Sequence, residues 1–218
     1  MMSRSLAVIM AIGVSASLAG AQYRVVPGRV NSDGFPTTPA SVCLSDTGTA
    51  HCYTPPEYDK NSPFGLDPKA ETIGHLDGKN LTLFTARFSA ANGNDATSYA
   101  LLMERDGEFV NLLPKMQLTN QSDFQIWNLL EFSDMPMLLT ADFIWDPYGS
   151  HAEGDTRFGN HQYTIHVLIF DHTTGRYVER IQYVTEKYYR GLDALDSIRI
   201  IDPEKKKILL RLRKGPSH

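Results

Sequence analysis

Two residues in the middle of the chain, Asp106 and Gly107, dictate a tight reversal of direction. A type I′ turn needs positive φ at both of its central positions, which glycine adopts freely and aspartate tolerates. The runs on either side alternate between apolar and polar side chains, which is the period of a half-buried β-strand. Residues 98–113 are therefore predicted to form a β-hairpin. The predicted cross-strand pairs are Arg105 with Glu108, Met103 with Val110, and Leu101 with Leu112.

A second hairpin is predicted over residues 162–185. The segment His172-Thr173-Thr174-Gly175 fits a turn whose glycine takes a left-handed bulge position. A one-residue slip would set the apolar Val167 against Arg180, so the bulged register is preferred. The predicted pairs are Val167 with Ile181, Ile165 with Tyr183, Leu168 with Arg180, and His166 with Gln182.

Strand patterns also occur on either side of the first hairpin. Residues 79–88 are rich in threonine and aromatic residues, which favour a strand, and a polar loop is predicted at 92–95. Strands are predicted at 124–127 and 138–145, separated by a break at Asp134-Met135-Pro136. Ser122 and Gln125 also fit the capping box of a helix, so a helix remains the alternative for the first of these strands.

The last segment, residues 202–214, is predicted to form a helix. Asp202 suits the N-cap and Pro203 the first helical position, while Gly215-Pro216 ends the pattern. An apolar stripe follows the helical period; it consists of Ile208, Leu209 and Leu212. The alternative is a strand over residues 208–212.

The N-terminal 21 residues resemble an export signal. Arg4 supplies a positive charge, residues 6–18 are apolar or small, and Ala19-Gly20-Ala21 matches the small-x-small pattern cut by signal peptidase. This apolar run is too short to span about 30 Å of hydrocarbon, so cleavage after Ala21 is expected rather than a retained anchor. The mature chain is expected to be secreted or periplasmic, with no further transmembrane segment.

Proline distinguishes the next segment, residues 22–75, from the rest of the chain. It holds seven of the 12 prolines, and proline fixes φ and removes a backbone donor. We expect an extended lead-in that wraps the core and forms no long ladders or helices. A disordered tail is the alternative, but the segment contains many aromatic and aliphatic side chains that can anchor it.

The two cysteines of the chain, Cys43 and Cys52, both lie in this lead-in. Oxidising compartments favour pairing, and Asp46 with Gly48 supplies turn chemistry between them, so a disulfide is predicted. A redox-active pair, two free thiols, and metal ligation together with His51 are the alternatives.

Residues 76–218 are expected to form the β-rich globular domain that ends in the helix. The fold class predicted for the whole chain is mostly β: an antiparallel sandwich or open barrel built from hairpins, with the lead-in and the C-terminal helix added. The net charge of −4 disfavours nucleic acid as a partner.

Residues 142–172 contain a high density of groups that bind metals or transfer protons. Four of the seven histidines fall here among several carboxylates, and the metal-ligand candidates are His151, Asp155 and His161. No spacing forces convergence, because His161 and His166 would point to opposite faces of one strand. The competing interpretation is a solvated polar loop followed by a strand.

Other features carry weaker functional hints. The basic run at 205–207, extended by Arg211, Arg213 and Lys214, can meet an anionic surface or form the solvated face of a helix. Tyrosines can stack on sugar rings or pack within strands; those near the second hairpin are Tyr177, Tyr183, Tyr188 and Tyr189.

Three short segments resemble exported bacterial proteins of unknown function: Cys52-Tyr53-Thr54-Pro55-Pro56, Asn111-Leu112-Leu113-Pro114, and the run from Asp202-Pro203-Glu204-Lys205 to Leu212. The resemblance implies a bacterial envelope or secreted setting. It implies no activity and no site residues.

The function expected from these observations is that of an exported, non-catalytic binding or envelope-associated β module, with an envelope component or a carbohydrate as ligand. The alternative is a secreted hydrolase that uses acidic residues of region 142–172, assisted by a metal. No cofactor is expected for the first function, and a divalent metal belongs only to the second.

Overall fold

The computed structural model describes residues 23–44, 51–91, 95–144, 160–190 and 198–214. The fold is mostly β, with antiparallel sheets and a C-terminal helix, as the sequence predicts. The expected signal peptide with its cleavage site after Ala21 lies outside the described residues, and so do residues 92–94 of the expected loop.

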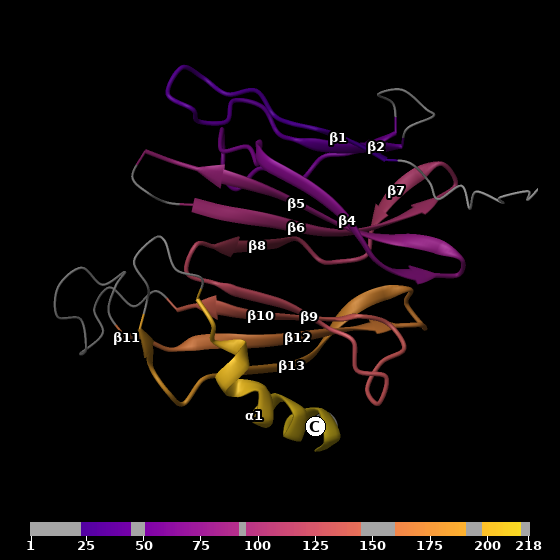
Figure 1. Ribbon diagram of the computed structural model, residues 1–218, viewed down its shortest axis with the longest axis vertical. Coiled ribbons are helices and arrows are strands. Elements are labelled where there is room, and N and C mark those ends of the chain that lie inside the picture. Colours follow the sequence, from indigo (N-terminus) through magenta and orange to yellow (C-terminus); the bar gives the residue numbers. More distant parts are fainter. Residues whose placement is uncertain (1–22, 45–50, 92–94, 145–159, 191–197, 215–218) are drawn as a thin grey trace, which may run out of the picture.

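Four layers stack on one another in the order N-terminal sheet, first central sheet, second central sheet and helix (Figure 1). The N-terminal sheet contains β1 (Tyr23–Val26), β2 (Ser41–Leu44) and β3 (Cys52–Tyr53). The first central sheet contains β4 (Leu66–Leu76), β5 (Lys79–Ser89), β6 (Asp95–Arg105) and β7 (Glu108–Asn111), with β8 (Met116–Thr119) paired to β6.

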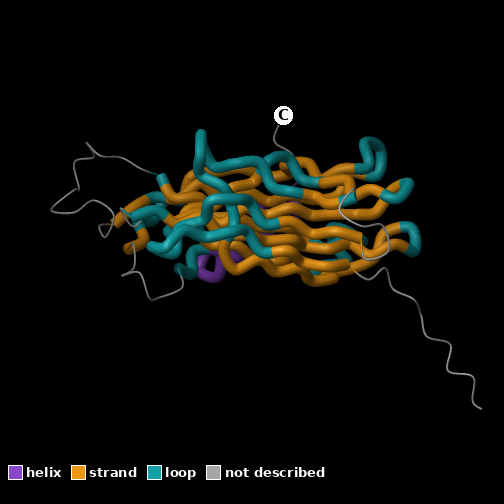
Figure 2. Tube along the Cα trace, turned by 90° about the horizontal axis from the view of Figure 1, so that it is seen from above, coloured by secondary structure: helices purple, strands orange, loops and turns teal. Residues whose placement is uncertain are grey.

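The second central sheet follows the order β13 (Arg176–Val184), β12 (Tyr163–Asp171), β10 (Met137–Phe143) and β9 (Asp123–Trp127). The outermost layer is α1 (Ile201–Lys214), and β11 (Asn160–His161) pairs separately with β14 (Tyr189–Arg190). Seen from above, the strands of the stacked sheets run in roughly one common direction (Figure 2). This is the aligned packing of a β-sandwich.

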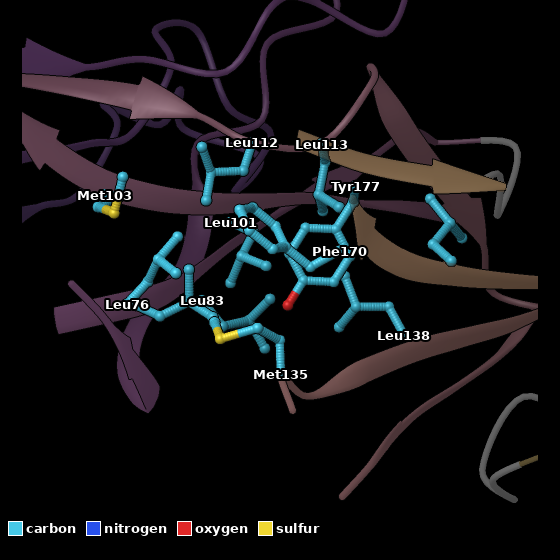
Figure 3. Close-up of a cluster of buried hydrophobic side chains, with 12 residues drawn as sticks. Leu76, Leu83, Leu101, Met103, Leu112, Leu113, Met135, Leu138, Phe170 and Tyr177 are labelled. Atoms are coloured by element: carbon cyan, nitrogen blue, oxygen red, sulfur yellow. The ribbon is translucent and has the colours of Figure 1, made fainter. Parts of the chain in front are cut away.

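Strand β5 shows why several layers are needed. Successive side chains of a strand point to opposite faces. Leu81 and Leu83 enter the core between the two central sheets, whereas Phe84 and Ala86 enter the core under the N-terminal sheet. Strand β5 therefore carries buried apolar side chains on both faces of the first central sheet. Figure 3 shows the core between the central sheets, where leucines meet Met103, Met135, Phe170 and Tyr177.

The second central sheet is also covered on both faces. Leu138 and Leu168 face the first central sheet, while Leu139 and Val167 face the helix. The helix buries Ile201, Ile208 and Leu212 against this sheet. The predicted stripe is confirmed for Ile208 and Leu212, while Leu209 is only partly buried.

The first predicted hairpin is confirmed. Asp106 and Gly107 have φ values of 54° and 81°, as a type I′ turn requires. Arg105 pairs with Glu108 and Met103 with Val110, and the amide of Leu112 donates to the carbonyl of Leu101 over 2.7 Å.

The second hairpin is confirmed, with the predicted register up to Val167 and a different register from Leu168 to the turn. Val167 pairs with Ile181, Ile165 with Tyr183, and His166 with Gln182 as predicted. The pair of Leu168 with Arg180 is wrong, because Leu168 stands opposite Glu179. A register shift lies between Val167 and Leu168, so the extra residue is Arg180 within β13. Gly175 has the expected positive φ of 64°. The bulge itself, however, lies at Arg180 within β13 and not at the turn.

The helix begins at Ile201, two residues before the predicted first helical position Pro203, and its cap comes from a distant strand. Oδ2 of Asp123 in β9 accepts hydrogen bonds from the amides of Ile200 and Ile201 over 2.9 and 2.8 Å. Asp202 instead accepts a bond from Nε2 of Gln125. Residues 123–127 form β9, so the helix indicated by the capping box is wrong, as is the C-terminal strand over 208–212.

The proline-rich lead-in contains a long ladder, contrary to expectation. Strand β4 begins at Leu66 and pairs with β5 along its length. Pro68 is tolerated because β4 is an edge strand and because the register shifts between Leu66 and Lys69, which leaves Asp67 and Pro68 out of the ladder.

The predicted disulfide is confirmed. Cys43 and Cys52 are neighbours in the β2–β3 pair and are joined by an S–S bond of 2.04 Å. The N-terminal sheet, which has only short strands, is therefore closed by a covalent link. Within the part of the chain that the structure describes, no helix has the length and apolar character needed to cross a membrane.

Two valines on neighbouring strands test the assignment of faces. Val167 is fully buried under the helix, whereas Val184 is 48% exposed. We expect Val167→Asp to lower the free energy of unfolding by at least about 3 kcal/mol, because it places an unpaired charge in an apolar layer. Val184→Asp should change it by less than about 1 kcal/mol. Chemical denaturation measures both, and equal destabilisation would contradict the assigned faces.

Reduction of the disulfide should loosen the N-terminal sheet first. The bond closes a loop of about ten residues, for which the chain-entropy estimate is about 2.7 kcal/mol. Hydrogen exchange with and without a reductant should show faster exchange in β1–β3 before β12 and β13 change. The Cys43→Ser/Cys52→Ser double variant should exchange equally fast with or without the reductant. If all sheets loosen together, the disulfide stabilises the whole molecule and this prediction is wrong.

Candidate functional site

The candidate residues of region 142–172 do not all lie within the described structure. His151 and Asp155 fall outside the described residues. His161 is 7% exposed in β11, with its ring 4.5 Å from the ring of Phe143. It lies on a different strand and in a different sheet from His166. The two imidazoles belong to separate environments.

His166 lies between two carboxylates on the second central sheet. Its Nε2 is 3.4 Å from Oδ2 of Asp142 in β10, and its Nδ1 is 2.5 Å from Oε2 of Glu179 in β13. The three side chains thus form a chain across three neighbouring strands. Asp142 and His166 fall within the dense region 142–172, whereas Glu179 lies outside it and was not predicted. The bulge at Arg180, which no local pattern indicates, aligns Glu179 with His166.

The surroundings of Asp142, His166 and Glu179 determine what these three side chains can do chemically. Burial raises the pKa of the Asp142 carboxyl, and the nearby His166 opposes that rise. Each ring nitrogen of His166 faces a carboxylate, so neither is left to bind a metal or to meet a substrate. Among the described residues, no group of three or more His, Cys, Asp or Glu side chains is arranged to hold a metal ion.

A separate hollow of about 320 Å³ lies on β4, β5 and β6. Its walls combine both charges, hydroxyl groups and one aromatic ring. The lining residues are Asp67, Lys69, Thr85, Ala86, Arg87, Thr97 and Tyr99. Its volume falls at the lower end of the range of about 300–1,000 Å³ that small-molecule sites occupy.

The guanidinium of Arg87 organises this hollow. Its Nε and Nη2 donate to Oδ2 of Asp67 over 3.0 and 2.8 Å, and its Nη1 lies 3.5 Å from Asp95. Asp67 has a positive φ of 46° at the register shift of β4, and this irregularity turns its carboxylate toward Arg87. The backbone geometry of β4 therefore helps to position the ion pair of Asp67 and Arg87.

The hollow exists because one sheet face changes from apolar to polar. Leu81 and Leu83 fill the core between the central sheets, and Thr85 and Arg87 follow them on the same face of β5. The ring of Tyr99 packs against Phe124 of the opposite sheet with centroids 4.2 Å apart, at the border between the two parts. Sequence analysis missed this site, although the change of polarity along alternate positions of β5 was a signal for it.

Three of the four tyrosines near the second hairpin pack in the core, whereas Tyr188 is 49% exposed. The hydroxyls of Tyr183 and Tyr189 donate to the two oxygens of Glu204, which is 6% exposed on α1. Tyr177 is buried and donates to the carbonyl of Pro136 over 2.8 Å. Burial is the main cause that raises the pKa of each of these tyrosines. For these three rings, packing prevails over exposed stacking on a ligand.

The basic run divides into packed and outward-facing cations. Lys207 and Arg211 lie over the ring of Tyr183, with 4.7 and 4.4 Å to its centroid, and Lys205 lies over Trp127 at 5.4 Å. Such cation–π contacts hold the helix against the second central sheet. Lys206, Arg213 and Lys214 are exposed on the helix.

Comparison of the chain with family models, with characterised proteins and with solved structures finds no match.

The exposed pair of His172 and Asp134 should make a pH-dependent contribution to stability. Nε2 of His172 lies 3.0 Å from both oxygens of Asp134, which raises the pKa of His172 above 6.5 and lowers that of Asp134 below 3.8. The stabilisation from the histidine is thus present below pH 6.5 and is lost as the pH rises through its folded pKa.

An NMR titration of the His172 ring measures this effect. The Asp134→Asn variant should return the pKa of His172 toward 6.5, because the hydrogen-bonded charge is its main cause. Asp33→Asn, an exposed substitution elsewhere, should leave it unchanged. An unchanged His172 pKa in Asp134→Asn would show that the pair does not form in solution.

Proposed function

We propose that this protein is an exported, non-catalytic binding module of the cell envelope that holds a small saccharide in the hollow on β4–β6. The observation that carries the proposal is the lining of that hollow. Asp67 and Arg87 form an ion pair with two hydrogen bonds, Lys69 adds a further donor, and Thr85 and Thr97 add hydroxyls. Export with cleavage after Ala21, to a secreted or periplasmic location, is part of this proposal, and the disulfide supports it.

A saccharide matches this lining better than an apolar or strongly charged ligand does. Each sugar hydroxyl both donates and accepts a hydrogen bond, and the hollow offers donors and acceptors in close mixture. The lining holds one acidic and two basic side chains, and Asp95, 3.5 Å from Arg87, supplies the second negative charge. The local charge is therefore balanced, and the hollow has no strong preference for an anion or a cation. Tyr99 supplies the apolar wall that the C–H groups of a sugar ring need.

The second candidate function is a secreted hydrolase that uses the acidic residues of region 142–172. The raised pKa of Asp142 beside His166 favours it, since a protonated carboxyl can act as a general acid. The engagement of both nitrogens of His166 by carboxylates supports the binding function instead.

A saccharide titration followed by two-dimensional ¹H–¹⁵N NMR tests the proposal. A panel of soluble mono- and disaccharides should include at least one that shifts the amides of Thr85, Arg87 and Thr97 saturably. Lys69→Ala and Arg87→Lys should each weaken its binding by about tenfold, since hydrogen bonds to charged groups are worth about 1.5–3 kcal/mol.

Lys79→Ala is the matched control, because Lys79 is an exposed lysine at the other end of β5 and outside the hollow. Its affinity should equal that of the unmodified protein. Shifts that avoid the hollow, or an equal loss of affinity in Lys79→Ala, would refute the site. Cleavage of a saccharide during the titration, abolished in Asp142→Asn, would establish the hydrolase in place of the binding module.

A further inference from the structure

The outer side of α1 carries a surface whose position and charge the fold does not explain. At 3.6 residues per turn, Lys206, Leu210, Arg213 and Lys214 fall on one side of the helix, opposite the buried Ile208 and Leu212. All four of these side chains are exposed. We call them, together with Leu130, the basic face.

Charge is strongly segregated onto this helix. Its six basic and two acidic side chains give α1 a net charge of +4, whereas the whole chain carries −4, so the remaining residues carry −8. No carboxylate among the described residues lies within ion-pair distance of Lys206 or Lys214. These cations are therefore available to an external anion.

Two leucines lie on the same surface. Leu210 is 51% exposed between the cations, and Leu130 is 86% exposed in the connection between β9 and β10. Glu131, the next residue, lies 3.7 Å from Arg213, which places this connection beside the last turn of α1. Figure 1 shows the connection reaching past the sheet toward the level of the helix, in the outermost layer of the molecule.

We propose that the basic face docks on an anionic lipid surface, with Leu130 and Leu210 entering the headgroup region. Each lysine or arginine near such a surface contributes about 1 kcal/mol, and exposed apolar side chains add burial that a polar polyanion does not offer. The pairing of cations with protruding leucines favours a membrane over a nucleic acid or an anionic polysaccharide.

The proposal deepens the envelope association and rests on that part of the proposed function, but it does not depend on the saccharide hollow. The hollow variants Lys69→Ala and Arg87→Lys should bind vesicles like the unmodified protein. Loss of vesicle binding and loss of saccharide binding are thus separate results.

Co-sedimentation of the purified chain with lipid vesicles tests the docking surface. The protein should sediment with phosphatidylcholine vesicles that contain phosphatidylglycerol, but not with phosphatidylcholine alone, and salt should weaken the binding. Lys206→Glu/Lys214→Glu should weaken it by at least about tenfold. Arg29→Glu/Lys60→Glu, which makes the same change of charge at exposed positions elsewhere, should leave most of it intact.

The leucines distinguish a membrane from other polyanions. Leu130→Ser/Leu210→Ser should weaken vesicle binding several-fold, while Val30→Ser, a change at another half-exposed aliphatic residue, should not. All of these positions are exposed, so unchanged thermal unfolding confirms that the variants remain folded. Absence of binding to the anionic vesicles would overturn the proposal. Binding to soluble dextran sulfate as tight as to vesicles, with no effect of the leucine changes, would overturn it in favour of a general polyanion site.

Discussion

The first central sheet carries large apolar side chains on both of its faces, so neither face can be left fully exposed to water. Phe84 and Leu102 point to one side and Leu83 and Leu101 to the other, all of them buried. Apolar surface of this extent is stable only when another layer removes it from solvent. The N-terminal sheet and the second central sheet supply the two covers. Because the second central sheet is apolar on its far face as well, it needs the helix in turn, and the layers end where α1 presents a polar side.

The last layer is attached by two acidic residues rather than by apolar packing alone. Asp123 caps the helix from β9, and Glu204 receives the hydroxyls of Tyr183 and Tyr189 inside the core. Burying a carboxylate costs free energy unless it accepts hydrogen bonds. Each of these two carboxylates therefore favours a single position of the helix on the sheet. Burial raises the pKa of Asp123, whereas the amides of Ile201 and Ile200 oppose the rise. These bonds define the position that leaves the basic face outward.

Local chemistry made the hairpins predictable. The turn at Asp106-Gly107 and the alternation around it fix a register within a few residues, and the spacing of Cys43 and Cys52 fits a short closed loop. Features that depend on distant partners were out of reach. The cap from Asp123 joins residues 77 and 78 positions apart, and no local pattern separates Arg180 as the bulged residue. The hollow was missed for a related reason: the polar positions of β5 acquire meaning only when one knows that the leucines before them face a second sheet.

The bulge at Arg180 has a consequence for the molecule as a whole. Strand β13 is an edge strand of the second central sheet, and the outward amides and carbonyls of an edge strand can recruit a strand from another molecule. The amide of Tyr177, near the start of β13, is already bonded to the carbonyl of Leu112. Val178 and Val184 are exposed on this edge strand, and burying them against another strand would stabilise such a contact. An extra residue between them breaks the regular spacing that an incoming strand must match, and the charges of Glu179 and Arg180 sit at the break. The irregularity that aligns Glu179 with His166 also makes this edge strand a poor template for fibrous aggregation.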